Sequence, residues 1–277
     1  MKDKKIIIGI IGVGFVGGAL KKYFQSKKCP LVVYDKYKEL GSPETVNQAD
    51  IVFIATPTPY RPKKGFDLSS VESAIKILQG SKVVVLKSSV VPGITDALQT
   101  KYPKHKFLFN PEFLREVSAY EDLIHPDRQI LGVTNKSKKI AEQIIKLLPK
   151  AKYEKIMPAK EAEMVKYMAN SFLALKVVFA NEFFEIAKKL KVDYKGVSQA
   201  VGKDLRIGES HLSVEHGGYR GYGGTCFPKD VNALIEHATK SGVKTPLLKA
   251  MRAVNRKLLK SSGLNEEYFL LAKHRKV

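Results

Sequence analysis

The 277-residue sequence contains no tryptophan and only two cysteines, Cys29 and Cys226. Two cysteines cannot form a disulfide framework, so we expect a protein of a reducing compartment, the cytoplasm. Uninterrupted apolar runs of about 18 residues are also missing, which argues against a membrane-spanning helix. The N-terminal part has a short apolar run, Ile6 to Gly12, with no small-residue cleavage site after it, so we expect no signal peptide.

Acidic residues are scarce as well, because 27 Asp and Glu stand against 48 Lys and Arg and give a formal net charge of +21. A charge of this size attracts polyanions, and nucleic acid is the first alternative to consider. The lysines are scattered, however, and aromatic residues do not alternate with them as in RNA-binding segments. We therefore expect a lysine-rich solvated surface with no nucleic-acid partner. Such a surface also suits phosphorylated small ligands.

Short apolar runs recur along the first half of the chain, and helix-like stretches separate several of them. The first run, residues 5–11, is almost continuously apolar, as in a buried parallel strand. The further runs are Leu31–Tyr34, Ile51–Ala55, Val83–Leu86, Phe107–Phe109 and Ile130–Val133. Residues 68–79, with Asp67 as a candidate cap, and residues 136–148 have helical patterns. The alternation predicts an α/β domain over residues 1–150 with a doubly wound parallel sheet.

After Pro158 the alternation of strand-like and helix-like stretches ends. Residues 159–190 contain neither Gly nor Pro and predict one long helix with apolar residues on most of its sides. We expect an all-helical domain over residues 151–260, built on this long central helix, followed by a basic solvated tail at 261–277. A helix this apolar buries more surface than one small domain covers, so we also expect a homodimer.

A glycine-rich turn follows the first apolar run directly and opens a helical pattern. It consists of Gly12, Val13, Gly14, Phe15, Val16 and Gly17. In such a turn the first glycine allows the tight bend, the second lets a pyrophosphate approach, and the third permits close helix–strand packing. The second apolar run ends in Asp35, which would bind the ribose hydroxyls and repel a 2′-phosphate. These features predict a Rossmann-like domain whose cofactor is NAD rather than NADP.

Three further loops follow predicted strands, namely Thr56–Pro59, Ser88–Gly93 and Asn110–Glu116. The carboxyl ends of parallel strands are where ligands of this fold bind. Glu112 and Glu116 supply two carboxylates in the third loop. Each loop is equally compatible with ordinary turn or surface chemistry, so position alone only favours a functional role.

Cys226 lies in a glycine-rich stretch that includes Gly221, Gly223 and Gly224 and ends in Phe227-Pro228-Lys229-Asp230. Pro228 suits the first position of a helix over 228–240. A cysteine just before a helix N-terminus and near a lysine has its thiolate favoured, so Cys226 is a candidate nucleophile. Cys29 has no such context and is expected to be inert. No His or Cys stands at ligand spacing from Cys226, so we expect no metal site.

Lys166 and Asn170 lie one turn apart on the predicted long helix and share a face. Polar groups within an apolar helix need partners, although a solvated stripe would also explain this pair.

Together these motifs resemble the nucleotide-sugar (UDP-glucose/GDP-mannose) dehydrogenase family over about residues 5–256. The matching pieces stand in family order: GVGFVG at 12–17, Asp35, ATPTP at 55–59, KSSVVPG at 87–93, NPEFLRE at 110–116, AEMVKYMAN at 162–170, DLRIG at 204–208 and GYGGTCFPKD at 221–230. The resemblance implies an enzyme of polysaccharide biosynthesis that oxidises the C6 alcohol of a nucleotide sugar to a carboxylate with two NAD. A UDP-sugar, UDP-glucose first, is the substrate we expect, and UDP-glucuronate the product.

The resemblance also implies roles for individual residues. Cys226 would be the nucleophile that forms a thiohemiacetal and then a thioester, with Lys166, Asn170 and Asp230 as its catalytic neighbours. Glu112 would be the acid/base of the hydrolytic step. The cofactor contacts implied beside the glycine turn and Asp35 are Thr56, Ser89, Glu116 and Lys229. The substrate contacts implied are Glu112, Phe113, Leu114, Arg115, Lys166, Asn170 and Gly223, with Arg206 reaching the sugar across a dimer interface.

The sequence departs from the family pattern in three places. Ser88-Ser89 replaces Ser-Thr, which preserves a hydroxyl. The segment between Arg206 and Cys226 is a few residues longer, which leaves the substrate contacts of 209–220 open. The third, nucleotide-clamping domain of the family does not follow, so a minimal enzyme, a fragment and a protein without activity all remain open.

Two rival functions also remain. A two-domain hydroxyacid dehydrogenase would transfer one hydride with Lys166 as its acid/base. A non-catalytic NAD-binding protein would bind the cofactor without turnover.

Overall fold

The computed structural model describes residues 5–62 and 65–271. The chain divides into two compact units. The first consists of residues 1–58 and 66–166, and the second of residues 59–65 and 167–277. The boundary falls inside one long helix, between Lys166 and Tyr167. The domain boundaries expected from sequence texture, at 150 and 260, remain predictions.

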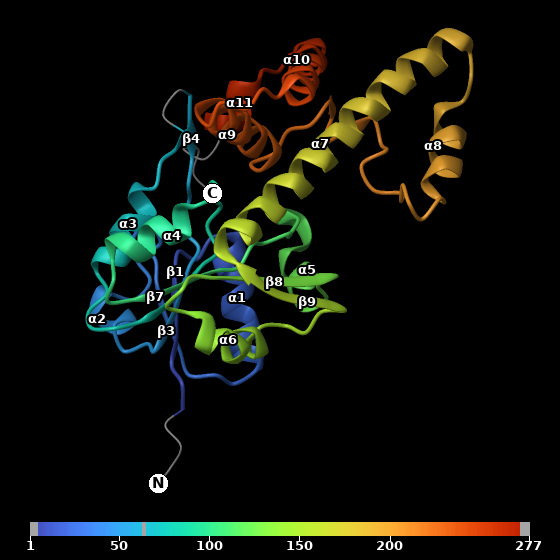
Figure 1. The fold of residues 1–277 in the computed structure, drawn as a ribbon. Coiled ribbons are helices and arrows are strands. Elements are labelled where there is room, and N and C mark those ends of the chain that lie inside the picture. The colour runs from blue at the N-terminus through green and yellow to red at the C-terminus, as the bar shows by residue number, and fades with distance from the viewer. Residues whose placement is uncertain (1–4, 63–64, 272–277) are drawn as a thin grey trace. The chain divides into compact units, whose positions relative to one another are not determined.

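The first unit is built on a sheet with seven strands among the described residues (Figure 1). In chain order these are β1 (Ile8–Ile11), β2 (Leu31–Tyr34), β3 (Ile51–Ile54), β6 (Val83–Leu86), β7 (Lys106–Phe109), β8 (Arg128–Val133) and β9 (Tyr153–Pro158). Their order across the sheet is β2-β1-β3-β6-β7-β8-β9. The chain moves outward from β1 to β2 and then reverses to β3, so the topological switch point lies between β1 and β3.

The sheet separates two hydrophobic cores. Successive residues of a strand point to opposite faces, so every second apolar residue contributes to the same core. In β3, Ile51 and Phe53 belong to one core, and Val52 and Ile54 belong to the other. The first core is covered by α1 (Phe15–Ser26), α5 (Ala119–Ile124) and α6 (Ala141–Leu147). The second is covered by α2 (Pro43–Val46), α3 (Ser69–Lys76) and α4 (Ile94–Lys101). The predicted α/β fold with helices on both faces is thereby confirmed (Figure 1).

The strands β2 and β6 have the predicted bounds, and the others differ by a few residues. One pair departs from a fully parallel sheet, because β7 and β8 are antiparallel, with Phe109 opposite Gly132. The edge strand β9, parallel to β8, was not predicted and lies at the start of the segment expected to be all-helical. Its sequence, Tyr153-Glu-Lys-Ile-Met-Pro158, is mostly exposed and polar, so it lacks the apolar run that marks a buried strand.

Two predicted helices of this unit begin differently in the structure. The helix expected at 68–79 spans Ser69–Lys76, with Leu68 rather than Asp67 as its N-cap. Asp67 still accepts a bond from the Ser69 N–H at 3.0 Å. The helix expected at 136–148 begins with the 3-10 turn η2 (Lys138–Ile140) before α6, and another 3-10 turn, η1 (Glu116–Ser118), precedes α5.

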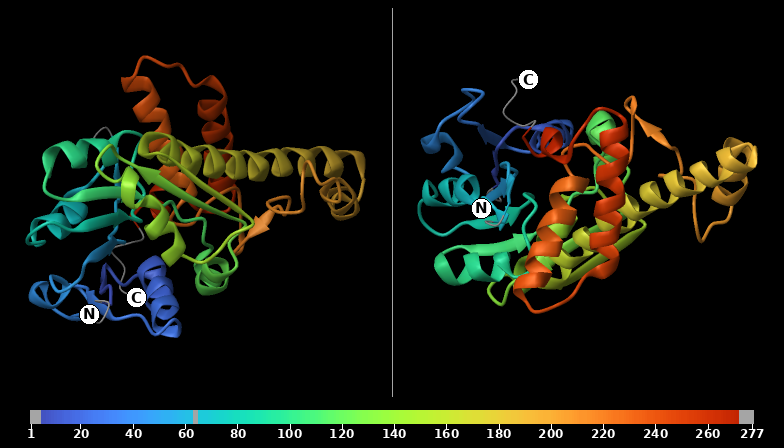
Figure 2. Two further views of the ribbon diagram at one scale, coloured as in Figure 1. Left: turned by 60° about the horizontal axis from the view of Figure 1, so that its bottom comes forward. Right: turned by 90° about the horizontal axis from the view of Figure 1, so that it is seen from above.

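The second unit is mainly helical and contains most of α7 (Ala159–Leu190), which has the predicted bounds. The helices α9 (Phe227–Lys240) and α10 (Pro246–Ser261) pack on α7 through a core that includes Val177, Val231 and Met251 (Figures 1 and 2). The segment 59–65 joins this unit, because the Tyr60 hydroxyl donates to Glu236 of α9 at 2.8 Å. It carries β4 (Tyr60–Arg61), which pairs with β5 (Gly65–Phe66).

Two short helices and a hairpin complete the described part of the second unit. Helix α8 (Tyr194–Gly202) is capped by the Asp193 carboxylate, and β10 (Glu215–His216) pairs with β11 (Tyr219–Arg220) in a hairpin. Helix α11 (Glu266–Leu271) lies inside the segment expected to be a solvated tail. Its Phe269 is buried against Tyr219, so this part is packed rather than solvated. The rest of the expected tail, 272–277, lies outside the described residues.

One stripe of α7 and the following segment leave large apolar side chains exposed. The stripe on α7 comprises Phe172, Phe179, Phe183, Ile186 and Leu190. Val192, Val197, Val201 and Leu205 continue the exposed set beyond the helix. The spacing on α7 follows the three- and four-residue steps of one helix face.

Candidate functional site

The three glycines of the turn after β1 have three different local environments. Gly12 has φ +86°, and a Cβ there would lie 2.9 Å from the Ala55 backbone. A Cβ on Gly17 would lie 1.9 Å from the Gly12 carbonyl oxygen, so only glycine permits this approach of α1 to β1. Beside Gly14 nothing described lies within 4 Å of such a Cβ. Gly14 is also the N-cap of α1 and has no side chain to cap the first helical N–H groups, which are open to an anion.

Asp35, at the carboxyl end of β2, holds the same turn through its carboxylate. Oδ2 accepts the Val13 N–H at 2.7 Å, and Oδ1 accepts the N–H groups of Tyr37 and Lys38 at 3.0 and 3.1 Å. A carboxylate offers about four acceptor positions, so Asp35 can still take a ribose hydroxyl. The residues present therefore fit a dinucleotide with an unphosphorylated ribose.

The loops after β3 and β6 are joined to each other at the same edge of the sheet. Ser88 Oγ donates to the Thr56 carbonyl at 2.6 Å, and Thr58 Oγ1 donates to the Ser89 carbonyl at 2.7 Å. The Thr56 hydroxyl is buried and has no partner among the described residues. A buried hydroxyl without a partner is costly, so a ligand or water at this edge would satisfy it.

A buried ion pair follows β7. Lys166 Nζ donates to Glu112 Oε1 at 2.7 Å and to the Glu112 carbonyl at 2.5 Å. The Leu114 N–H donates to Glu112 Oε2 at 2.9 Å. Burial by itself raises the pKa of Glu112, but the Lys166 ammonium and these bonds outweigh it and hold that pKa below its ordinary value. Glu112 is therefore an anion whose two oxygens are both oriented, and Lys166 is not on a solvated stripe.

Cys226 is the N-cap of α9, as its sequence context predicts, although Pro228 is the second rather than the first helical residue. Its Sγ lies 3.7 Å from the Thr225 hydroxyl. One turn along α9, Asp230 is fully buried and accepts bonds from Asn170 Nδ2 at 2.6 Å and from Lys229 Nζ at 2.5 Å. Lys229 thus directs its ammonium to Asp230. The second unit therefore brings together four residues that the sequence had selected.

The glycines before Cys226 have a packing role that the sequence did not predict. A Cβ on Gly223 would meet the Tyr219 hydroxyl at 2.4 Å and Phe269 at 2.6 Å. A Cβ on Gly221 would meet Asn255 Oδ1 at 2.5 Å. Asn255 in turn bonds both the N–H and the carbonyl of Tyr222. At Gly221 and Gly223 the stretch therefore lies too close to the protein's own side chains to accept a larger residue.

Three further candidate residues are exposed. Arg115 pairs with Asp122 through two side-chain bonds, at 3.1 and 2.6 Å, and Arg206 pairs with Asp204 at 2.6 Å. Glu116 is exposed in η1. The side chains of Arg115 and Arg206 are 74% and 89% exposed, so a ligand or partner could recruit either at little cost.

Among the described residues, three buried charged residues were not singled out from the sequence, namely Glu163, Lys87 and Glu266, of which the last accepts bonds from Asn232 and Arg256. Glu163 on α7 accepts the N–H and hydroxyl of Thr95 at 2.9 and 2.6 Å and the N–H of Gly93 at 2.5 Å. Lys87, directly after β6, donates to Asn110 Oδ1 at 2.7 Å. Lys87 and Glu163 stand in two of the segments that resemble the family, 87–93 and 162–170, but the sequence does not show that they are buried or which residues they bond.

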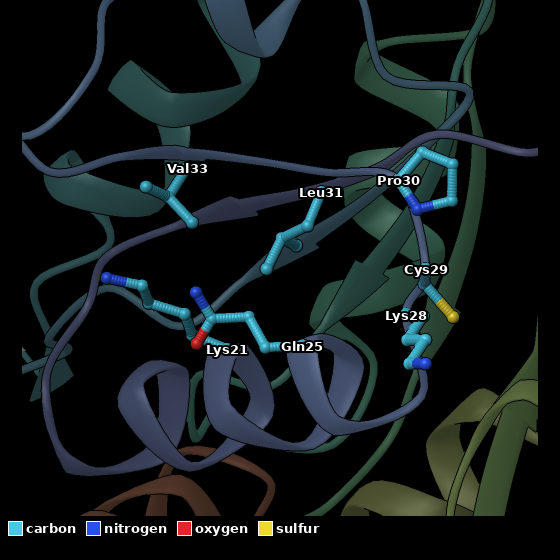
Figure 3. A pocket seen from close by; sticks show the side chains of 7 residues that line it. All are labelled: Lys21, Gln25, Lys28, Cys29, Pro30, Leu31 and Val33. Atoms are coloured by element: carbon cyan, nitrogen blue, oxygen red, sulfur yellow. The ribbon is translucent and has the colours of Figure 1, made fainter.

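A hollow in the first unit lies elsewhere. Its lining residues are Lys21, Gln25, Lys28, Cys29, Pro30, Leu31 and Val33 (Figure 3). It is formed by the C-terminal part of α1 and the start of β2, whereas the glycine turn and Asp35 follow the carboxyl ends of β1 and β2. The hollow is therefore separate from the residues predicted to hold the cofactor, and Cys29 stays without an assigned role.

The switch-point loops, the glycine turn and the acidic residue after β2 define a dinucleotide-binding α/β protein. Comparison with known families is consistent with this class. Residues 38–151 match the UDP-glucose/GDP-mannose dehydrogenase family, NAD binding domain, and residues 160–257 match the central domain of the same family. The chain belongs to the UDP-glucose/GDP-mannose dehydrogenase family, and the predicted cofactor of its first domain, NAD, is confirmed.

Individual relatives agree with this membership. UDP-glucose 6-dehydrogenase TuaD of Bacillus subtilis is 36% identical over 228 residues, which are 78% of this chain and 48% of the relative. The structure of a UDP-glucose dehydrogenase from Pyrobaculum islandicum superposes with a TM-score of 0.79 at 31% identity, over 94% of this chain and 72% of that one. The chain spans about half the length of the curated relatives it matches.

A more distant structure shares the fold alone. 3-Hydroxyisobutyrate dehydrogenase of Mycobacterium tuberculosis superposes with a TM-score of 0.71 at 14% identity, over 98% of this chain and 99% of that one.

Proposed function

We propose that this chain carries the NAD-binding and central domains of a nucleotide-sugar 6-dehydrogenase that oxidises UDP-glucose to UDP-glucuronate in the cytoplasm. The observation that carries the proposal is the position of Cys226 at the N-cap of α9, one turn before Asp230, which is bonded to Asn170. A helix N-terminus favours the thiolate. A cysteine nucleophile is what distinguishes a four-electron oxidation from a single hydride transfer.

In this proposal the first unit binds the cofactor. The N–H groups at the start of α1 take the pyrophosphate, Asp35 takes the ribose hydroxyls, and Thr56 supplies its buried hydroxyl. Ser89, Glu116 and Lys229 are proposed as further cofactor contacts. When bound, NAD accepts one hydride in each of the two oxidation steps.

The chain's own side chains are proposed to carry out the bond-making and bond-breaking steps at the sugar C6 carbon. After the alcohol has lost a proton and a hydride, the Cys226 thiolate adds to the aldehyde carbon and forms a thiohemiacetal. Loss of a second hydride gives a thioester, and a water that has lost a proton to Asp230 or Glu112 breaks the C–S bond. The carboxylate leaves and the thiolate returns. Lys166 and Asn170 are proposed to stabilise the oxyanion, and the segment 112–116, Gly223 and Arg206 to bind the substrate.

The second candidate is a two-electron hydroxyacid-type dehydrogenase with Lys166 as its acid/base. The likeness in fold to 3-hydroxyisobutyrate dehydrogenase keeps it in view. The buried Lys166–Glu112 pair suits either reaction, because a base could act in both. Only the four-electron reaction needs Cys226.

A homodimer forms the last part of the proposal. The stripe from Phe172 to Leu190 exposes large apolar side chains on one face of α7, and the ring centroids of Phe179 and Phe183 lie 4.6 Å apart at a tilt of 35°. A second copy of the same stripe is the partner that a two-fold axis supplies.

The direct test is NAD reduction by the full 277-residue chain across a panel of UDP- and GDP-sugars. We expect NADH with UDP-glucose, and no UDP-glucuronate from the Cys226→Ala variant, with NAD affinity nearly unchanged. NADH with a hydroxyacid but no nucleotide sugar would favour the second candidate. NAD binding without turnover on any substrate would leave a binding protein.

A further inference from the structure

Lys87 is a buried charged residue that the proposed mechanism does not use. It follows β6 directly and is 4% exposed. A lysine is almost never buried unless it is paired, because an ammonium is costly to remove from water. Burial lowers the pKa of Lys87 to about 7, with Glu112 opposing and Lys166 reinforcing this effect. The cost of burying Lys87 must therefore be offset by the interactions that it makes.

The partner of Lys87 is Asn110, the residue that follows β7 and is itself 1% exposed. Asn110 Nδ2 donates to the Ile130 carbonyl at 2.7 Å and to Gln129 Oε1 at 2.8 Å, both in β8. Gln129 continues the chain of bonds by donating to the Pro149 carbonyl at 3.1 Å. Lys87 is therefore the first donor in a buried network that crosses the ends of β6, β7 and β8.

The network lies where the main chain leaves the sheet. The last pair between β7 and β8 is Phe109 with Gly132, and Pro111 has no N–H to continue the ladder. The Asn110 side chain takes over this role by bonding a β8 carbonyl. Glu112 comes two residues later in the same turn, with its carboxylate bonded to Lys166 and to the Leu114 N–H.

We propose that Lys87 is a positioning residue that, through Asn110, fixes the turn carrying Glu112. Its donated bond satisfies the Asn110 oxygen while Nδ2 bonds β8, so the amide is held from both sides. Without that donor the buried oxygen loses this partner, which weakens the connection of the segment 110–112 to β8. The catalytic consequence rests on the function proposed for Glu112, whereas the structural consequence does not.

The test compares Lys87→Met, which keeps the side-chain length without a donor, with Lys82→Met. Lys82 stands at the other end of β6 and donates to the carbonyls of Asn47 and Ala49, both at 2.7 Å, away from this turn. Amide hydrogen exchange at Leu114 reports the Glu112 geometry directly. We expect Lys87→Met to accelerate that exchange about tenfold, the size of effect that one lost buried hydrogen bond gives. Lys82→Met should leave it unchanged.

Lys87→Gln, which keeps a shorter donor, should give an intermediate exchange rate and covers the case in which Lys87→Met does not fold. In a protein that turns over, we also expect Lys87→Met to lower kcat while KM for NAD stays unchanged. Unchanged Leu114 protection in Lys87→Met, or equal acceleration in Lys82→Met, would overturn the proposal. If the wild type shows no turnover, the proposed function fails, and the Leu114 exchange alone still decides the role of Lys87.

Discussion

Asp35 uses its carboxylate to hold the protein's own backbone before any ligand binds. The bond to the Val13 N–H joins β2 to the glycine turn, and the bonds to Tyr37 and Lys38 shape the loop that follows. The sequence singled out this residue, and its role in binding the ribose stays a prediction. It gave no sign of the bond to Val13, because that contact depends on how β1 and β2 are placed side by side.

We expect Asp35→Asn to weaken NAD binding about tenfold, because a charged acceptor that stabilises the turn and the ribose is lost. NADP should lose less affinity or gain, since the repulsion of its 2′-phosphate is removed. Fluorescence titration with NAD and with NADP measures the two dissociation constants and hence the ratio of the two affinities.

Asp50→Asn provides the matched control. Asp50 also accepts a backbone N–H, that of Ile7 at 3.0 Å, but at the amino end of the sheet. The ratio of NAD affinity to NADP affinity in Asp50→Asn should equal that of the wild type. An unchanged ratio in Asp35→Asn would contradict the ribose assignment.

The junction of β1 and α1 contains two glycines with the same open surroundings, of which only Gly14 belongs to the predicted pyrophosphate turn. Gly14 and Gly18 both have open space where a Cβ would be. Gly14→Ala should fold with nearly unchanged stability and bind NAD much more weakly, because the methyl group would occupy the approach of the pyrophosphate.

Gly18→Ala should keep NAD affinity and raise the free energy of unfolding by about 1 kcal/mol, since alanine is the better helix former. Calorimetry of both variants, with and without NAD, separates the two effects. Equal NAD affinity in the two variants would show that the pyrophosphate does not approach Gly14.

Glu163 links α7 to the start of α4 and should make folding depend on pH. Burial, opposed by the bonds to Thr95 and Gly93, raises the pKa of Glu163 to about 6 from an ordinary 4.5. Between these pH values the folded protein holds a proton that the unfolded chain has released, so stability falls as pH rises. We expect the stability of the wild type relative to Glu163→Gln to fall by about 2 kcal/mol from below pH 4.5 to above pH 6.

Urea unfolding at a series of pH values measures this difference. Glu161→Gln, an exposed position in the first turn of the same helix, should show no such change. A flat difference for Glu163→Gln would mean that its carboxyl has an ordinary pKa.

The elements that could be predicted from sequence are those whose signal is local. The long helix α7 has no Gly or Pro between its ends, and β2 and β6 are pure apolar runs. Strand β9 could not be predicted in this way, because it forms at the sheet edge by pairing with β8 and leaves most of its side chains in water. The antiparallel β7–β8 pair likewise depends on distant contacts.

The candidate residues also divide into those with a local sequence signal and those that only the structure identifies. Cys226, Asp230 and Asn170 stand in motifs, and the structure places all three in one cluster of the second unit. The importance of Lys87 and Glu163 depends on burial and on partners 23 and 68 residues away in the sequence. No pattern within a window of sequence carries that information.

At the scale of the molecule, the exposed stripe on α7 predicts self-association. We expect Phe179→Asp combined with Phe183→Asp to convert a dimer into a monomer, because two buried charges without partners would oppose the interface. Sedimentation velocity at micromolar concentration measures the change. Val243→Asp, which alters an exposed valine after α9, should leave the dimer intact, and a monomeric wild type would contradict the assignment.

The proposed four-electron oxidation depends on Cys226. The most direct measurement is the number of NADH formed per UDP-glucose consumed by the full chain. We expect two NADH per sugar for the wild type and for Cys29→Ala, and no UDP-glucuronate from Cys226→Ala. Cys226→Ser should stall the cycle, since serine is the poorer nucleophile and leaving group. One NADH per substrate, with full activity in Cys226→Ala, would contradict the account.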